Sequence, residues 1–203
     1  MMYILRYRRK EVASKFNRDR LILSAIQNKD QLYFMMDTEF DGIYQREAVE
    51  RKRQYGENTL KLSGRNKDIR LLPIKYKELE NLVTELSRQK VAVFRKNMEL
   101  YVEIECRDVV PGDMIFLTSG DIVPADVRII YENGLYVDQH VFTGIKDKIK
   151  KGPTTSGYSC SMFSIIDIPN ICLMGTRIVG GVARAVAIGT GSATYLGKLV
   201  YGY

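Results

Sequence analysis

The residues best suited to chemistry form a basic run after a Thr-Gly pair. Thr143 and Gly144 are followed by Ile145, and the next residues include four lysines: Lys146, Lys148, Lys150 and Lys151. A charged ammonium group only donates hydrogen bonds and isoleucine has no acceptor, so proton abstraction would require a lysine pKa strongly lowered by burial. The run predicts contact with a phosphate or an acidic surface. Sequence drift in an unconstrained loop is an equal alternative.

A second basic stretch lies near the N-terminus, where Tyr3, Tyr7 and Phe16 are interleaved with Arg6, Arg8, Arg9 and Lys10. Such a stretch can contact an anionic membrane surface, at ~1 kcal/mol for each basic residue, although a solvated helix face is the simpler interpretation. The whole chain has 31 Lys and Arg against 24 Asp and Glu, a net charge of +7. These charges are spread unevenly along the sequence, so a basic face for nucleic acid is not expected.

Other reactive side chains are few. His140 is the only histidine, and the three cysteines, Cys106, Cys160 and Cys172, show no C-x-x-C spacing. They cannot supply a four-ligand metal site, so neither a metal nor a cofactor is expected and His140 is expected to be structural. The segment 189–199 contains Gly191, Gly197 and Lys198, but its spacing does not fit a phosphate-binding loop.

The N-terminal part of the chain has helical patterns. Gln45–Tyr55 is a charged helix followed by Gly56, a residue that commonly ends helices, whereas Gln31–Met36 is apolar and ambiguous. Lys75–Lys90 carries leucines and a valine at helical spacing. These patterns divide the chain into an N-terminal helical segment (1–60), a linker (61–74) and a β-rich domain (75–203).

After Lys90 the hydrophobic period changes to that of strands. The expected strands are Val91–Phe94, the alternating stretch 99–105, Met114–Thr118, Val127–Tyr131, Leu135–Val137 and Gly181–Gly189. A turn is expected at Glu132-Asn133-Gly134, and Ser156–Ser164 has the composition of a loop. Short strands separated by frequent turn signals indicate a compact sandwich or barrel-like β unit, and therefore an α+β protein.

Two turn-rich stretches bound the Met114–Thr118 strand. The first contains Pro111, Gly112 and Asp113; the second reads Gly120-Asp121-Ile122-Val123-Pro124-Ala125-Asp126. Taken alone, they predict the turns of a well-packed β core. Asp126 and Arg128 are placed to pair with each other or to cap loop amides.

These two stretches resemble the actuator domain of P-type cation ATPases, in which Pro-Gly-Asp is followed by Gly-Asp-x-x-Pro-Ala-Asp. Further similarities follow in order, at Leu135–Asp138, at Asn170 to Gly175 with Thr176, and at Ile188–Gly197. Within the family, the sequence of these motifs most resembles that of magnesium-transporting members. The resemblance implies a distorted β-sandwich, jelly-roll-like actuator unit that includes the N-terminal helical segment.

The resemblance also implies two membrane helices before the Lys75 helix. Leu60–Leu72 is too short and too charged to cross a bilayer. The family's phosphorylation and nucleotide domains are not found in this sequence, so the chain is expected not to act as an enzyme by itself. A cytoplasmic location is expected, with a peripheral position at the inner face of the membrane.

The signature loop departs from the family at two positions. The resemblance places Glu at Ile145 and Ser at Lys146, and implies that the glutamate activates the water that hydrolyses the aspartyl phosphate. Without that carboxylate, the chain is expected to be a noncatalytic, free-standing interaction or regulatory module acting on a cation pump, or a degenerate remnant of one. The expected partner is a P-type ATPase or its phosphorylation domain. The alternative is the actuator fragment of a split or truncated magnesium-type pump that takes part in phosphoenzyme hydrolysis.

Overall fold

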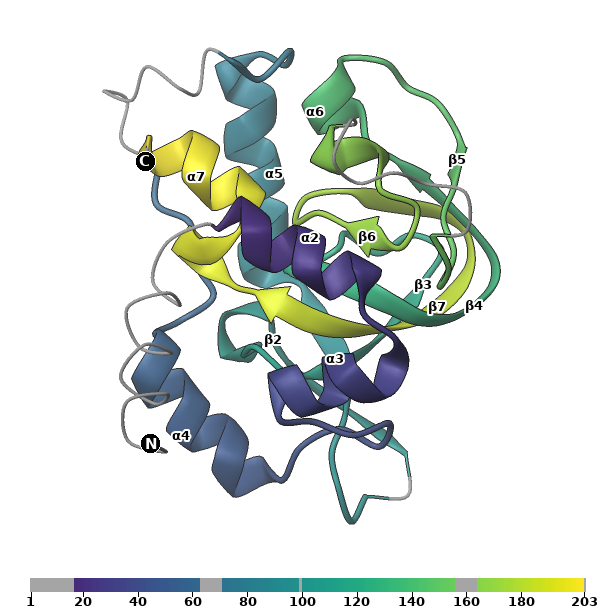
Figure 1. Cartoon of the computed structure of the whole chain (residues 1–203). Helices are drawn as coiled ribbons and strands as arrows, with labels where there is room; N and C mark the ends of the chain where they lie inside the picture. The colour runs from purple at the N-terminus through teal and green to yellow at the C-terminus, as the bar shows by residue number, and fades with distance from the viewer. Residues whose placement is uncertain (1–16, 63–70, 99, 156–163, 203) are drawn as a thin grey trace.

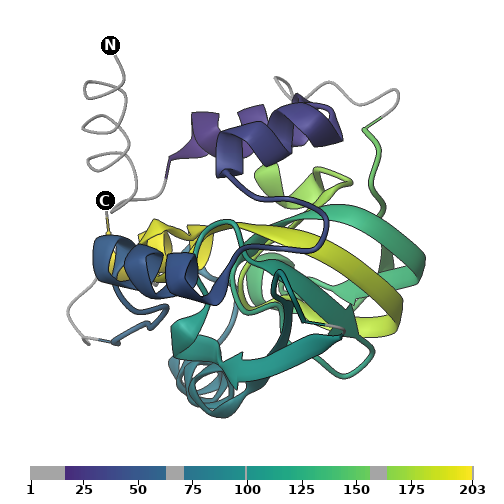
Figure 2. The same ribbon diagram turned by 90° about the horizontal axis from the view of Figure 1, so that it is seen from below.

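A computed structural model describes residues 17–62, 71–98, 100–155 and 164–202. A curved sheet lies between helices on either side (Figures 1 and 2). The α-helices are α2 (Arg18–Ile26), α3 (Lys29–Met36), α4 (Gln45–Tyr55), α5 (Tyr76–Arg88), α6 (His140–Thr143) and α7 (Tyr195–Tyr201). The strands are β1 (Lys90–Phe94), β2 (Tyr101–Glu105), β3 (Met114–Thr118), β4 (Asp126–Asp138), β5 (Ile149–Lys150), β6 (Ile171–Cys172) and β7 (Arg177–Gly189).

The sheet is antiparallel throughout and has the order β2-β1-β3-β7-β4-β5, with β6 beside β4. The long strands β4 and β7 form its curved centre (Figure 1). Alternate residues such as Val91 and Val93 are buried, as the period of two requires. The predicted α+β class is confirmed, and the Met114–Thr118 strand has the predicted bounds.

Helices cover both faces of the sheet (Figure 2). On one side, α5 buries Leu79, Leu82 and Leu86, which share one helical stripe. On the other side, side chains from β4 and from the residue before β6 donate hydrogen bonds to backbone carbonyls of α2. The Arg128 Nε donates to the Ser24 carbonyl at 3.2 Å, and the Asn170 side-chain amide donates to the Ala25 carbonyl at 2.9 Å. These contacts join the N-terminal helices to the same core as the sheet.

The N-terminal helices begin and end at residues with clear local roles. The Asn28 side chain accepts from the Gln31 amide at 2.9 Å, which caps the start of α3. The ambiguous stretch Gln31–Met36 is therefore helical. The predicted helix Gln45–Tyr55 is confirmed as α4, and Gly56 follows it as the C-cap.

The predicted turn at Glu132-Asn133-Gly134 is wrong. Strand β4 continues through these residues and stays paired with β7, with a shift of register between Asn133 and Tyr136. A long antiparallel partner can absorb extra residues as a bulge without ending the strand. The turn-forming residues therefore bend β4 rather than reverse it.

Candidate functional site

The signature loop leaves the sheet at the end of β4. The Asp138 carboxylate accepts from the His140 amide at 2.8 Å and starts the short helix α6. Gly144 ends α6 with a φ of 73°, and its amide donates to the His140 carbonyl at 2.8 Å. A Cβ at Gly144 would lie 3.0 Å from the Pro73 Cβ. Positive φ and this close approach both require glycine, so the Thr-Gly turn is intact.

The two substituted positions face solvent. Ile145 is 66% exposed, and Lys146 is exposed beside it. The Thr143 hydroxyl lies 3.2 Å from the Ile145 amide and 3.2 Å from the Gln139 carbonyl, which holds the backbone of the loop. The loop therefore presents an apolar side chain and a cation where the resemblance places a carboxylate and a hydroxyl.

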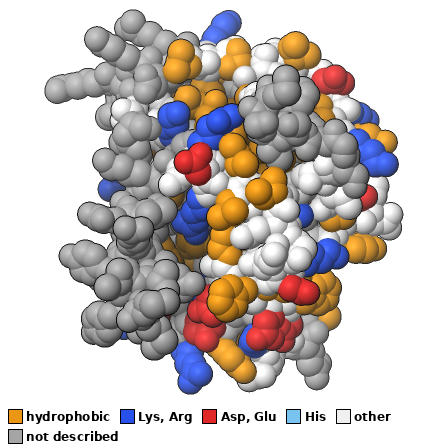
Figure 3. Space-filling model, in the orientation of Figure 1, with side chains coloured by type: hydrophobic (Ala, Val, Ile, Leu, Met, Phe, Trp, Pro, Cys, Tyr) orange, Lys and Arg blue, Asp and Glu red, His pale blue; other side chains and the backbone are white. Residues whose placement is uncertain are grey.

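The predicted interaction residues separate into two groups. Lys148 is exposed on the same loop as Lys146, and Lys150 is exposed in β5, which follows this loop. Arg6, Arg8, Arg9 and Lys10 lie outside the described residues, as does Cys160, so contact through the N-terminal stretch stays a prediction. On the face shown in Figure 3, lysine and arginine side chains are interspersed with acidic and hydrophobic ones.

Lys151 is not an interaction residue, contrary to the sequence prediction. Its side chain is buried, with 2% of the residue exposed, and Nζ donates to the carbonyls of Ile166 and Ile168 at 2.8 Å each. Burial lowers the pKa of this ammonium group. Lys150 and Lys151 point in opposite directions because successive side chains alternate about an extended strand. Lys151 thus holds the 164–168 segment rather than a partner.

The Pro-Gly-Asp stretch forms a buried junction with the N-terminal helices. Asp113 pairs with Arg95, and both side chains are almost completely buried. Asp113 also accepts from the Val110 amide at 3.0 Å. The carbonyl of Pro111 accepts from Arg51 at 2.9 Å. Gly112 has a φ of 92° and approaches Arg51 so closely that a Cβ would overlap its guanidinium.

The second stretch joins distant loops. Asp121 accepts from the Thr118 amide at 2.8 Å, closing the turn that contains Gly120. Asp126 accepts from the amides of Met174 at 2.8 Å and Tyr195 at 2.7 Å, so it caps amides as expected. Its pairing with Arg128 is not observed, because that guanidinium binds backbone carbonyls instead.

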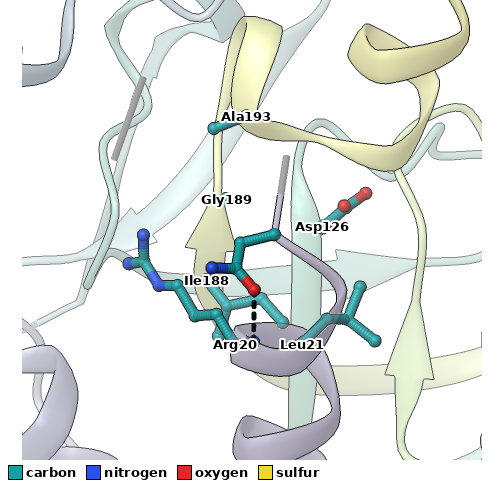
Figure 4. A pocket seen from close by; sticks show the side chains of 7 residues that line it. Arg20, Leu21, Asp126, Ile188, Gly189 and Ala193 are labelled. Atoms are coloured by element: carbon teal, nitrogen blue, oxygen red, sulfur yellow. Dashed lines mark hydrogen bonds between the residues drawn. The ribbon is translucent and has the colours of Figure 1, made fainter. Parts of the chain in front are cut away.

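Burial raises the pKa of Asp126 to about 7. The hollow next to it, lined by Arg20, Leu21, Ile188, Gly189 and Ala193, has a volume of about 20 Å³ (Figure 4). That volume is about the space that one water molecule needs. The hollow is therefore too small for a substrate, and Asp126 is a structural carboxylate.

Gly175 and Thr176 complete the predicted structural motif beside these loops. Gly175 has a φ of 94°, and its amide donates to the Val123 carbonyl at 2.9 Å. The Thr176 carbonyl accepts from the Val123 amide at 2.8 Å. Pro124, also predicted to be structural, supplies a carbonyl that accepts from the Asn58 side chain at 2.9 Å.

Sequence reasoning did not predict the contacts of Asn58. Its amide nitrogen also donates to the Cys106 carbonyl at 2.9 Å, and its oxygen accepts from the Gly191 amide at 2.7 Å. It therefore joins three loops, including one that lies 133 positions away. Its sequence signal is its place at the end of the stretch 53–58, which resembles the family's N-terminal helical segment.

The remaining candidates are structural. Cys106 and Cys172 are buried thiols whose pKa values are raised by burial to about 12 and about 11, which suppresses thiolate reactivity. His140 is half-buried at the start of α6. Among the described residues, no group of three or more His, Cys, Asp or Glu side chains could hold a metal ion. The described helices include none long and apolar enough to cross a membrane.

The fold and the motifs agree with a family comparison. The family described as "P-type ATPase actuator domain" matches residues 85–202, more than half of the chain. The chain belongs to the P-type ATPase actuator domain family. Within this actuator domain, Asp113, Asp126 and Thr176 of the structural motif are buried, whereas Gly120 is exposed. The signature loop keeps its turn, and its two substituted residues face solvent.

The matches to individual relatives cover about half of this chain and less than a fifth of each relative. The "Magnesium-transporting ATPase, P-type 1" of Escherichia coli K12 is 38% identical over 99 residues, which cover 49% of this chain and 11% of that protein. The "Calcium-transporting ATPase" of Bacillus subtilis is 34% identical over 122 residues, covering 57% of this chain and 12% of that protein. A solved zinc-transporting PIB-type ATPase covers 58% of this chain and 17% of its own, with a TM-score of 0.44 and 14% identity.

Proposed function

We propose that this actuator domain is noncatalytic and acts as an interaction or regulatory module on a cation pump. The supporting observation is Ile145, which stands where the resemblance implies the water-activating glutamate. Its side chain is 66% exposed and has no acceptor atom, whereas Gly144 keeps the turn that presents it. Water activation needs an acceptor within hydrogen-bond reach, so Ile145 can make contact but cannot position the water.

The chemistry of the contact follows from the loop lysines. Lys146 and Lys148 are exposed on the loop and Lys150 in β5 just after it, with Asp147 as the acidic residue between them. Such a surface complements carboxylates or a phosphorylated aspartate on the pump's phosphorylation domain. Docking on a pump would place the chain at the inner face of the membrane. This location follows from the proposal and is tested with it.

Binding to a purified pump tests the proposal. The probe is the E. coli magnesium-transporting ATPase in lipid nanodiscs, with empty nanodiscs of the same lipid as the reference. Replacing Lys146 and Lys148 together by Gln should weaken binding about 3- to 10-fold, because each exposed ion pair contributes about 0.2–1 kcal/mol. The matched control replaces Lys29 on α3 and Arg53 on α4, both exposed, by Gln and should leave the binding affinity unchanged. Equal binding to pump and empty nanodiscs would show lipid contact instead and would remove the proposal.

The alternative is an actuator fragment that takes part in phosphoenzyme hydrolysis, and the 38% identity to a magnesium-transporting ATPase favours it. It predicts that the chain accelerates dephosphorylation when mixed with separately produced phosphorylation and nucleotide domains of that pump. The noncatalytic proposal predicts no acceleration. Ile145→Glu with Lys146→Ser serves as the comparison, since it supplies the carboxylate that the alternative needs.

A further inference from the structure

One edge of the sheet is open at strand β2. In the part of the chain that the structure describes, β2 pairs only with β1, in a continuous antiparallel register from Lys90 opposite Glu105 to Phe94 opposite Tyr101. Strand β2 contains no proline and no bulge. Its outer backbone groups are therefore available to an added strand, and only its charged side chains select which strand can add.

A hollow lies on the sheet face beside this edge. It has a volume of about 150 Å³, which is suited to one side chain rather than to a cofactor. The small side chain of Ala92 forms part of its lining, and Ala92 stands opposite Glu103 on β2 and Phe116 on β3. Directly opposite residues share a face, so these side chains surround the hollow.

The wall of the hollow is aromatic. Tyr101 and Phe116 stack at 5.9 Å with an interplanar angle of 9°, and Phe94 meets each of them edge-on at 6.4 Å. The same cluster already binds a cation within the molecule. The Arg184 guanidinium lies 3.4 Å from the centroid of Phe94 and 3.7 Å from that of Phe40. Phe94, which adjoins the hollow's Tyr101 and Phe116, therefore already makes one guanidinium–aromatic contact.

Two carboxylates line the hollow, those of Glu103 and Asp121, and neither forms an ion pair with a described residue. Glu103 is exposed and makes no ion pair with a described residue, whereas Lys90, the cation among the lining residues, pairs with Glu105 outside the lining. The Asp121 carboxylate accepts only from the Thr118 amide among the described residues, and burial raises the pKa of this carboxyl group. A cation entering the hollow would gain both carboxylates and the aromatic wall.

We propose that the hollow binds the guanidinium of an arginine carried by an extended segment of a partner protein, which adds as a strand to the free edge of β2. A residue opposite Glu103 on the added strand faces the hollow, while the backbone of that strand pairs with β2. Charge complementarity selects a basic residue at that position. The site lies on strands β1 to β3 and does not depend on the signature loop.

The test uses the short peptide acetyl-Thr-Val-Arg-Val-Thr-amide, titrated into the isotopically labelled protein by NMR. The β2 amides and the residues around Ala92 should shift on binding. Replacing the peptide's arginine by uncharged citrulline should weaken binding about 5- to 20-fold, the loss expected for a cation–π contact together with an ion pair. Equal affinity of the two peptides, shifts confined to other surfaces or no binding at millimolar peptide would each overturn the proposal.

Protein variants separate the hollow from general charge attraction. Glu103→Gln should weaken the arginine peptide about 5-fold and leave the citrulline peptide unchanged. Ala92→Leu should fill the hollow and abolish the difference between the two peptides. Glu50→Gln removes the same charge from an exposed site on α4 and should have no effect. An equal loss in Glu50→Gln and Glu103→Gln would reduce the binding to non-specific attraction and contradict the proposal.

Discussion

The buried Pro-Gly-Asp junction and the signature loop belong to the same domain but meet opposite physical demands. At the junction, Asp113 and Arg95 are shielded from water, and each finds its partner inside the fold. In the loop, Ile145 and Lys146 extend into solvent. A change at the junction leaves a buried charge unpaired, whereas a change at the loop tip costs almost nothing in folding. The scaffold is therefore constrained by stability, and the loop residues are constrained only by what they contact.

Breaking the junction should have the largest effect on stability. Arg95→Ala leaves Asp113 buried without its partner, which is expected to lower the free energy of unfolding by about 3–5 kcal/mol. Urea denaturation followed by circular dichroism measures the change. The double variant Arg95→Met with Asp113→Leu should recover part of the loss, because it removes both charges. A loss below 1 kcal/mol in the single variant would contradict the assignment of this pair as a structural anchor.

The Asp126 junction makes a pH-dependent contribution. Burial raises the pKa of the Asp126 carboxyl group to about 7 in the folded state. Between about pH 4 and 7, this group is therefore protonated in the folded state and ionised in the unfolded state. Stability from this group should rise as pH falls through that window, by at most about 4 kcal/mol. The measurement is the difference between wild-type and Asp126→Asn unfolding curves at several pH values. A difference that is flat from pH 8 to 5 would exclude the raised pKa.

Lys150 and Lys151 are adjacent in the sequence, but one side chain is exposed and the other is buried. They therefore compare a solvent-facing residue with a structural one at nearly the same place in the fold. Lys151→Ala removes the donor of two carbonyls and should cost about 1–3 kcal/mol, the penalty for leaving buried polar groups unsatisfied. Lys150→Ala should change stability by less than about 0.5 kcal/mol, as is usual for exposed positions. Thermal and urea unfolding measure both variants. Similar losses in the two variants would show that the inward and outward assignment of these side chains is wrong.

The smallest effect is expected at the loop tip. Ile145→Glu with Lys146→Ser should leave the free energy of unfolding within about 0.5 kcal/mol of wild type, because both positions are exposed. A loss above 1.5 kcal/mol would mean that the loop carries part of the core. The variant is also suited to functional comparison, since a stable fold separates chemistry from misfolding.

Local patterns predicted those parts of the fold that depend on local physics. The helix Gln45–Tyr55 and the strand Met114–Thr118 have the predicted bounds because hydrophobic period and capping residues act over a few positions. The turn at 132–134 failed because pairing with β7 overrides local turn signals. The contacts of Asn58 were not predicted because its acceptors and donor lie 48 to 133 positions away.

The candidate site was predicted in a similarly uneven way. The Thr-Gly loop was implied by the family resemblance, and the exposure of Lys146, Lys148 and Lys150 follows from their residue type. The burial of Lys151 could not, since it depends on carbonyls at Ile166 and Ile168 that only the folded chain brings near. The hollow over Ala92 depends on residues from three strands, so no short stretch of sequence indicates it.

The most direct test of the central claim measures the decay of the aspartyl phosphate on the separately produced phosphorylation and nucleotide domains of the E. coli magnesium-transporting ATPase, which do not carry that pump's own actuator domain. The chain is added in molar excess over these domains. A loop with isoleucine at the position of the water-activating glutamate is predicted to leave the decay rate within about 2-fold of the rate without the chain, since general base catalysis contributes about 10²–10⁴-fold when present. Acceleration of 10-fold or more by the wild-type chain would contradict the noncatalytic account.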